Sequence, residues 1–370
     1  MEFTVNKIEL VRELGLTQGV VEKKTTIPVL SNVLLEARDD QVTLTATDLE
    51  LGVRSTCKAA VARPGATTLP SRKLLDYTRL LPDADLHIKV GENHSAMIVC
   101  GRSKTRIAGM SRENFPELPR MPAPVAQIPS KLLSGLISKT VFAISTEASR
   151  YTLNGALLLL KPDSITMVAT DGHRLAFIEA GCALEGISGQ LRALVPKKGM
   201  TEIQGLAEEA GESAAVAVSS DDNHLFFQIG KRLLIARKLT GQFPDYERVL
   251  PRDNDRVLVL NREEAAAAIR RVAQFADERS HAIRVVLTPG EIKLAASGSE
   301  SGESEETLPA DGVTAEMQIG FNAQYLLDFL GAISTETVHL DLKDEQSAGQ
   351  LRPGGNGDHN YRYVIMPMRI

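Results

Sequence analysis

The chain has 370 residues, of which 43% are hydrophobic and 24% charged, and a formal net charge of −5, a composition typical of a globular protein. It contains no apolar run of the roughly 18 residues that a membrane-spanning helix needs, and its three cysteines are isolated, which argues against a disulfide framework or a zinc cluster. We therefore expect a protein of the reducing cytoplasm, and the net acidity argues against a surface coated in basic charge for nucleic acid.

In chain order, one pattern recurs three times. A short apolar strand leads into a helix, and a second strand-to-helix junction follows later in the same third of the chain. The first helices of the three thirds are predicted at Lys7–Leu14, Lys131–Phe142 and Arg262–Phe275. The second junctions lie at Leu69-Pro70-Ser71, Val195-Pro196-Lys197 and Gly320-Phe321-Asn322, about 125 residues apart. Repetition at a fixed spacing indicates one structural unit that is used several times.

Segments between the helices predict short strands, several of them with alternating apolar and polar residues. They lie at 29–38, 41–47, 49–58, 86–90, 96–101, 105–110, 153–160, 164–170, 175–180, 215–219, 225–230, 233–239, 283–287, 291–296, 304–308, 337–341 and 362–366. Two segments, 297–304 and 353–360, are predicted to be surface loops. One helix followed by about four strands gives a helix layer on a sheet. We predict an α+β fold of three tandem two-layer helix/antiparallel-sheet domains, at residues 1–122, 123–252 and 253–370.

The predicted helices carry more basic than acidic residues, although the chain as a whole is acidic. Surface helices commonly contain Lys and Arg, so this bias has an ordinary explanation. Alternatively, the helices share one face and present a basic surface to phosphate groups, a contact that carries no sequence information. The sequence has no helix-turn-helix signature, zinc-finger spacing or aromatic RNA platform, so any contact with nucleic acid is expected to be non-specific.

Motifs of nucleotide-binding proteins, serine hydrolases and zinc proteases are missing, and no His has metal-ligand spacing to another His or Cys. Asp171 and His173 suggest a catalytic pair, but no nucleophile is indicated beside them. The tripeptide Ala-Thr-Asp ends at Asp48 and again at Asp171, which matches the repeat spacing. This recurrence favours a turn in which the Asp side chain caps backbone N–H groups. We expect no catalytic residue, metal or cofactor.

Longer motifs occur at 168–175 (VATDGHRL), 243–251 (FPDYERVLP) and 363–370 (YVIMPMRI), together with 45–50 (TATDLE) and 150–155 (RYTLNG). With these motifs the chain resembles the family of the bacterial replicative sliding clamp, the β subunit of DNA polymerase III. The likeness extends from residue 1 to 370 in register with the three repeats. It implies that two chains join head to tail into a closed ring of six domains, whose helices line a hole for duplex DNA.

The resemblance also implies contact residues for DNA and for the second copy. Those matching DNA-contact positions are Lys24, Arg72, Tyr151, Lys197 and Lys198. At the dimer interface, an edge strand with Thr105 and Ile107 would meet Gln274 and Phe275 of the other copy. Thr105 and Gln274 stand where the family often has bulky apolar residues.

A peptide pocket between the second and third domains is a further implication of the resemblance. Its residues would be Arg150, Thr152, Leu153, Thr170, Gly172, His173, Arg174, Leu175, Pro244, Arg248, Val249, Tyr325, Val364, Ile365, Met366, Pro367 and Met368. Methionines suit such a site because they adapt to varied apolar partners. Thr152 stands where the family often has tyrosine. Without the resemblance, 364–368 would be interpreted as a terminal strand that faces the core.

The partners implied by the family are double-stranded DNA, the polymerase III α subunit, the clamp loader, other proteins with a clamp-binding motif and a second copy of the chain. The protein would be a cytoplasmic, nucleoid-associated accessory subunit without a catalytic site or membrane contact. One alternative is a paralogous clamp that is insensitive to a clamp-directed antibiotic. Another is a nucleic-acid-processing enzyme with its site at Asp171–Arg174.

Overall fold

The computed structural model describes residues 1–22, 26–184, 186–187, 189–298, 302–313, 316–355, 357 and 359–369. The described residues form two compact units. The first unit contains Met1–Lys131 and Thr201–Lys238, and the second contains Leu132–Met200 and Leu239–Ile370. Among the described residues, no helix combines the length and the hydropathy that crossing a membrane requires.

Six α-helices lie in the described ranges, and each begins within one residue of a junction predicted from the sequence. They are α1 (Lys7–Thr17), α2 (Ser71–Leu80), α3 (Ser130–Ser138), α4 (Lys197–Ala210), α5 (Arg262–Ala273) and α6 (Ala323–Ala332). Asn side chains explain three of these starts, because Asn6, Asn261 and Asn322 accept hydrogen bonds from N–H groups in the first turns of α1, α5 and α6. Such caps satisfy donors that have no partner within the helix.

Helix α3 is shorter than the predicted 131–142. It ends at Ser138, and a separate 3-10 turn follows at Val141–Ala143. Thr140 is fully buried between them, and its hydroxyl donates to the carbonyl oxygens of Leu136 and Ile137. A threonine that bonds back to the preceding turn competes with helix continuation, which accounts for the early end.

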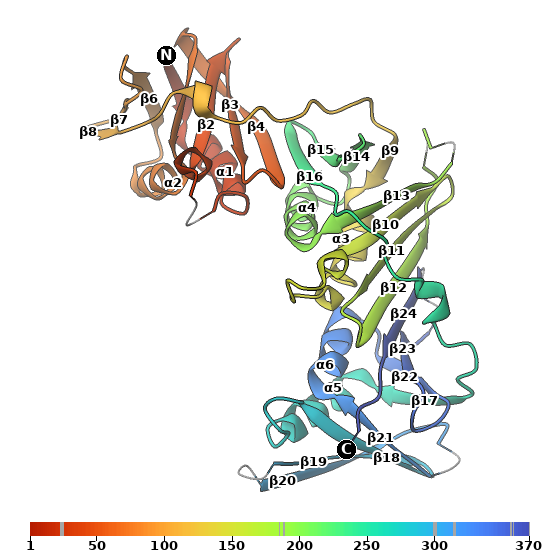
Figure 1. Ribbon diagram of the computed structural model, residues 1–370. Coiled ribbons are helices and arrows are strands. Elements are labelled where there is room, and N and C mark those ends of the chain that lie inside the picture. Colours follow the sequence, from red (N-terminus) through yellow and green to blue (C-terminus); the bar gives the residue numbers. More distant parts are fainter. Residues whose placement is uncertain are drawn as a thin grey trace. The chain divides into compact units, whose positions relative to one another are not determined.

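The first unit is built on a 12-stranded antiparallel sheet. Its strands are β1 (Glu2–Asn6), β2 (Asn32–Arg38), β3 (Gln41–Thr47), β4 (Leu51–Arg63), β5 (Gly65–Pro70), β6 (Asp85–Val90), β7 (Ala96–Cys100), β8 (Ser103–Ile107), β9 (Ala126–Pro129), β14 (Ala215–Ser220), β15 (His224–Ile229) and β16 (Arg232–Arg237). The main path runs β8-β7-β6-β1-β4-β16-β15-β14-β9, with β2, β3 and β5 paired beside it. The long strand β4 pairs with β16 (Figure 1), so the sheet continues from the first repeat into the middle repeat.

The second unit holds two antiparallel sheets. The larger runs β13-β10-β11-β12-β24-β23-β22-β17 and the smaller β20-β19-β18-β21. The bounds are β10 (Gly155–Lys161), β11 (Ser164–Thr170), β12 (Arg174–Gly181), β13 (Leu191–Pro196), β17 (Arg256–Asn261), β18 (Ala282–Thr288), β19 (Glu291–Gly298), β20 (Gly302–Pro309), β21 (Met317–Asn322), β22 (Thr337–Leu342), β23 (Gly349–Pro353) and β24 (His359–Ile365). Pairing of β12 with β24 makes one sheet from the middle and last repeats.

Apolar side chains that pack against the sheets form the cores. In the first unit, Phe3 of β1, Leu10 of α1 and Leu74 of α2 belong to one buried cluster. In the second unit, a cluster with Leu157, Phe177 and Val364 lies on one face of the large sheet. Burial of aliphatic and aromatic carbon is the main term that stabilises both units.

Several predicted segments have different extents in the structure. The strand predicted at 29–38, β2, begins at Asn32 instead of Val29, because Pro28–Ser31 form a 3-10 helix with proline at its start. The predicted loop at 297–304 is wrong for its described residues, since Ser297 pairs with Glu303 and Gly298 with Gly302 in a β-hairpin. Strand β23 is missing from the prediction.

A buried ion pair joins two repeats inside the first unit. Glu13 of α1 is only 2% exposed, and its carboxylate accepts hydrogen bonds from Nε (3.0 Å) and Nη2 (2.9 Å) of Arg232 on β16. We expect Arg232→Met to lower the free energy of unfolding by about 3 kcal/mol, because it leaves a buried carboxylate without its main partner. Calorimetric and denaturant unfolding measure the change.

Arg237→Met is the matched control. The Arg237–Glu50 pair is more than half exposed on both sides, and exposed pairs contribute little, so this variant is expected to change stability by less than about 0.5 kcal/mol. Combining Arg232→Met with Glu13→Leu is expected to restore most of the loss, because no carboxylate is then left buried. Wild-type stability in the single Arg232 variant would contradict the assignment.

Candidate functional site

The turn between β11 and β12 is fixed by the two side chains that open it. Thr170 Oγ1 donates to the carbonyl oxygen of Arg174 (2.6 Å) and accepts from the N–H of Gly172 (3.0 Å). Asp171 Oδ1 accepts from the N–H groups of His173 (2.9 Å) and Arg174 (3.0 Å). Gly172 has a φ of 89°, a left-handed conformation that favours glycine. The prediction that Asp171 caps a turn is therefore confirmed.

The first repeat contains the same turn between β3 and β4. Thr47 Oγ1 accepts from the N–H of Leu49 and donates to the carbonyl oxygen of Leu51, both at 2.9 Å. Asp48 Oδ1 accepts from the N–H groups of Glu50 (3.0 Å) and Leu51 (2.6 Å). Leu49 adopts a φ of 78° where the middle repeat has its glycine. The prediction of a recurring Asp-capped turn is confirmed here as well.

Both carboxylate oxygens of Asp171 are occupied by this turn. Oδ2 accepts from Arg174 Nε at 3.0 Å, and the hydrogen bond from His173 comes from its backbone N–H, not from its ring. A general acid–base pair needs the imidazole and the carboxylate to meet. The geometry of Asp171 is therefore that of a structural turn, and it gives the enzyme hypothesis no support.

A cavity of about 110 Å³ opens beside the turn. It is lined by Leu153, Thr170, Gly172, Arg174, Leu175, Pro244, Val249, Val364 and Met366. Leu175 and Val364 are directly paired residues of β12 and β24, and the Met366 N–H continues this pairing by donating to the His173 carbonyl oxygen at 2.9 Å. Sheet register thus brings the terminal segment against the turn. All nine lining residues belong to the set implied by the family resemblance.

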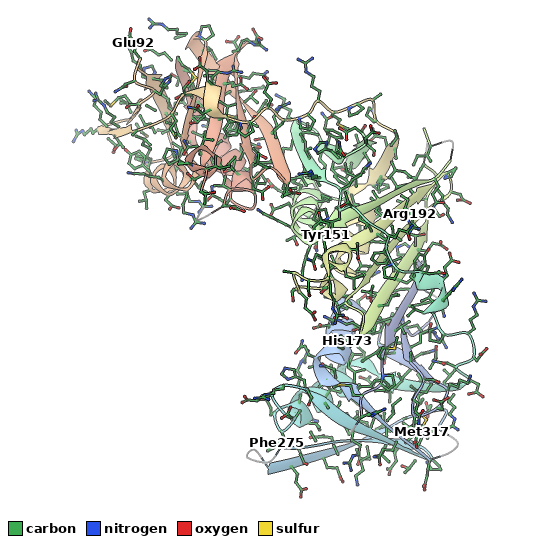
Figure 2. The ribbon with its side chains drawn as sticks, viewed as in Figure 1. Glu92, Tyr151, His173, Arg192, Phe275 and Met317 are labelled. Carbon is green, nitrogen blue, oxygen red and sulfur yellow. The ribbon has the colours of Figure 1, made fainter. Side chains whose placement is uncertain are left out.

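Four more residues of that set lie near the turn or on its exposed side. Arg150 donates through Nη1 to the Asp171 carbonyl oxygen and forms an ion pair with Glu147. His173 is exposed (Figure 2), and Arg248 is an exposed residue paired with Asp245. Thr152 is partly buried in a 3-10 turn at Tyr151–Leu153. All four side chains are polar, and none of them lines the cavity.

The remaining residues of the set lie on β24, on the segment after it and on α6. Ile365 is fully buried; because neighbours on a strand face opposite sides, it points away from the cavity that Val364 lines. The Met368 N–H donates to the Gly320 carbonyl oxygen at 2.8 Å, and Pro367 is partly buried. The ring of Tyr325 lies against the guanidinium of Arg174, with 4.2 Å from Cζ to the ring centroid.

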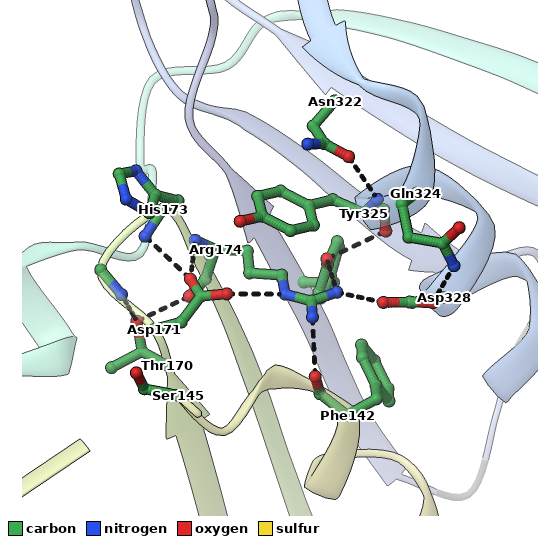
Figure 3. A network of polar contacts seen from close by, with 12 residues as sticks. Phe142, Ser145, Thr170, Asp171, His173, Arg174, Asn322, Gln324, Tyr325 and Asp328 are labelled. Carbon is green, nitrogen blue, oxygen red and sulfur yellow. Dashed lines mark hydrogen bonds and ion pairs between the residues drawn. The ribbon is translucent and has the colours of Figure 1, made fainter. Parts of the chain in front are cut away.

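Arg174 joins the turn to α6. Its Nη1 donates to Asp328 Oδ2 at 2.5 Å, and its Nη2 donates to the Phe142 carbonyl oxygen at 2.7 Å (Figure 3). Burial lowers the pKa of Arg174, but Tyr363, Asp328 and Asp171 outweigh this effect and raise it overall. The guanidinium is therefore a permanent cation. Asp328 and Phe142 were not among the predicted site residues, and a contact between positions so far apart leaves no pattern in the sequence.

The predicted DNA-contact residues that the structure describes lie at helix starts and on one 3-10 turn. Arg72 is exposed in the first turn of α2, and Lys197 and Lys198 open α4. Neither first turn contains an acidic residue, although acidic groups are the ones that a helix N-terminus favours. Tyr151 is 50% exposed (Figure 2). Lys24 lies outside the described residues.

Two of the predicted dimer residues lie on an edge strand of the first unit, and the other two follow a helix of the second unit. Thr105 and Ile107 are on β8, which ends the sheet of the first unit, and Ile107 is 2% exposed. Gln274 is the exposed C-cap of α5, and Phe275 follows it near Gly302 at the start of β20 (Figure 2). Strand β20 ends the small sheet of the second unit.

The two edges carry opposite charges, a signal that the sequence prediction did not use. On β8 the exposed positions are Lys104 and Arg106. On β20 they include Glu303 and Glu305. In both segments charged residues stand at alternate positions, which the sequence shows. Only when both segments are assigned as strands does it follow that Lys104 and Arg106 share one face of β8, and Glu303 and Glu305 one face of β20.

Models of three domains of the DNA polymerase III beta subunit match consecutive parts of the chain. The N-terminal domain matches residues 1–119, the central domain 127–245 and the C-terminal domain 247–369. The chain is 36% identical to the beta sliding clamp of Pseudomonas putida over 373 residues and 37% identical to that of Pseudomonas aeruginosa over 376 residues. Both matches cover 100% of each chain.

Solved structures are similar over the same length. One is the DNA polymerase III subunit beta from Pseudomonas aeruginosa, with a TM-score of 0.94 and 35% identity. Another is a sliding clamp from Bartonella birtlesii bound to griselimycin, with a TM-score of 0.95 and 32% identity. In both comparisons 100% of this chain and 100% of the other are covered.

Proposed function

The chain belongs to the DNA polymerase III beta subunit family, and we propose that it acts as a DNA sliding clamp. Domains at 1–122, 123–252 and 253–370 form half of a ring, and a second copy closes it head to tail around duplex DNA. The ring is a processivity factor, and catalysis belongs to the polymerase that it tethers. The observation that carries this proposal is the match to all three domains of the family along the entire chain.

DNA contact is assigned to the first turns of α2 and α4 and to Tyr151. The free N–H groups of a helix N-terminus attract anions, and nearby cations strengthen that field. Arg72 on α2 and the pair Lys197 and Lys198 on α4 provide such cations. These groups bind phosphate without reading bases, which suits a protein that moves along DNA of any sequence.

Ring closure is assigned to pairing between the basic edge β8 of one copy and the acidic edge β20 of the other. An exposed sheet edge offers unpaired N–H and C=O groups that can pair with a strand of another chain. Thr105 and Gln274 bring little apolar surface to this contact, so the charges at Lys104, Arg106 and the Glu-rich β20 take a larger share in specifying it.

The cavity beside the 170–174 turn is assigned to peptide segments of partner proteins, among them the polymerase α subunit and the clamp loader. Apolar lining and a Met residue at the mouth suit an extended tail with Leu or Phe side chains. Because such partners act at replicating DNA, we propose that the protein works at the bacterial nucleoid in the cytoplasm.

Met366→Asp is expected to weaken binding of a fluorescent peptide, taken from the clamp-binding segment of the polymerase, at least roughly tenfold. Met366 is 39% exposed at the cavity, so the substitution should preserve the fold while placing a carboxylate where apolar side chains are to be buried. Truncation before Met366 is expected to abolish binding while the dimer persists. Fluorescence anisotropy measures both affinities.

Gln318→Asp adds the same charge at an exposed position of β21 in the same unit and is expected to bind the peptide like the wild type. Unchanged affinity in both the Met366 variant and the truncated chain would place the peptide site elsewhere. The sliding-clamp proposal as a whole is tested separately, by release of the protein from a circular duplex when the circle is cut.

A further inference from the structure

The guanidinium of Arg174 uses all three of its nitrogens inside the protein. Nε donates to Asp171 Oδ2 (3.0 Å), Nη2 to the carbonyl oxygen of Phe142 (2.7 Å), and Nη1 to Asp328 Oδ2 (2.5 Å) and to the Tyr363 hydroxyl (3.4 Å). The side chain is only 10% exposed. Figure 3 shows these contacts converging from the turn, from α6 and from the segment after α3.

Two aromatic rings lie close to the guanidinium as well. Its Cζ lies 4.2 Å from the ring centroid of Tyr325 and 5.5 Å from that of Phe142. Two carboxylates, Asp171 and Asp328, form ion pairs with it. Four of the five guanidinium N–H groups therefore have a partner inside the protein. We expect the contribution of Arg174 to the cavity wall to come mainly from its methylene stem.

Asp328 holds the far end of this arrangement. It lies on α6 in the third repeat and is not part of the cavity lining, but it bonds Arg174, which belongs to the turn of the middle repeat. Its other oxygen accepts from Gln324 Nε2 at 2.7 Å (Figure 3). One carboxylate oxygen of Asp328 is thus held by its own helix, and the other holds Arg174.

We infer that Arg174 and Asp328 are positioning residues of the proposed peptide pocket: they hold the 170–174 turn against α6 and leave the cavity an uncharged site for apolar side chains. This inference rests on the proposed peptide function. An arginine in a binding site usually suggests that it binds a carboxylate of the ligand. The inference assigns Arg174 a different role, because its charged group pairs with carboxylates of the protein itself.

The test uses two fluorescent peptides that are identical except for one Asn-to-Asp change beside the apolar anchor. Arg174→Lys and Asp328→Ala are each expected to weaken both peptides by the same factor, about tenfold, because a displaced turn affects the cavity and not a charge contact. Asp328→Asn keeps an acceptor in the same place and is expected to lose less than Asp328→Ala. The double variant Arg174→Lys/Asp328→Ala should be no weaker than the poorer single variant, since both residues act as one unit.

Three controls separate the possible outcomes. Asp253→Ala removes a carboxylate that is 79% exposed and should bind like the wild type. Circular dichroism at the assay temperature checks that each variant is folded. A variant that is less stable but still fully folded at this temperature is expected to keep its affinity, so a measured loss of affinity reports on the pocket. Sedimentation checks that the dimer is retained.

A loss confined to the Asp-containing peptide would overturn the inference, since Arg174 would then be a direct ligand. Wild-type affinity in folded Asp328→Ala would overturn it too. If Met366→Asp binds both peptides like the wild type, the proposed pocket itself is wrong and the inference falls with it. Equal losses for both peptides, together with the milder effect of Asp328→Asn, support it.

Discussion

Protein loaded onto a nicked circular duplex is expected to stay bound through gel filtration, and to leave quickly once a restriction enzyme cuts the circle. The proposed phosphate contacts are few and non-specific, so by themselves they exchange rapidly. A closed ring, by contrast, cannot leave a circle without opening, but it slides off a free end. The measurement is the fraction of labelled protein that elutes with DNA after loading by a bacterial clamp loader and ATP, before and after cutting.

A linear duplex with a bulky protein bound at each end provides the control, because it keeps the same DNA sequence and length but blocks sliding off the ends. Retention on it is expected to equal retention on the circle. Equal retention on the circle and on the open linear duplex would rule out a topological link, and the protein would then be an ordinary non-specific DNA-binding protein.

Reversing the charge of either sheet edge is expected to convert the dimer into monomers. Lys104→Glu with Arg106→Glu makes β8 acidic, and Glu303→Lys with Glu305→Lys makes β20 basic. Each change places like charges at both interfaces of the ring, which should weaken the dimer roughly a hundredfold or more. Glu305 also pairs with Lys293 at 2.7 Å, but an exposed pair contributes little to folding. Sedimentation at micromolar and nanomolar concentrations measures the change.

Mixing the two reversed proteins supplies the decisive control. In a head-to-tail ring with one chain of each kind, the acidic β8 meets the basic β20 at one interface, and two unchanged edges meet at the other. The mixture is therefore expected to form dimers although neither protein does so alone. If the mixture stays monomeric while both chains are folded, these edges are not the interface.

The local structure was the most predictable part of the fold. Helix starts at Asn6, Asn261 and Asn322 follow from side-chain capping, and the turns at Asp48 and Asp171 follow from a recurring tripeptide. These features depend on residues within a few positions of one another. For the same reason, the nine residues around the cavity were within reach only through the family motifs, because they come from separate parts of the chain.

The failures have physical causes of the same kind. The 297–304 segment contains mainly Gly, Ser and Glu, which have low strand propensity, but pairing with a neighbouring strand overrides that preference. Helix α3 ends early because of the buried Thr140. The Arg174–Asp328 pair spans two repeats, and the opposite charges of β8 and β20 become visible only when each strand is placed at the edge of its sheet.

The copied turn has diverged between the repeats. A Cβ atom at Gly172 would lie 2.7 Å from Arg150 Nη1, whereas the first repeat carries Leu49, a half-exposed side chain in the same left-handed conformation. The two turns therefore share one backbone geometry but differ in the side chain that they present to solvent. In the proposed ring each subunit would offer one such peptide site, beside its glycine turn. We therefore expect partner proteins to compete for two sites per ring, so that the release of one partner limits the binding of the next.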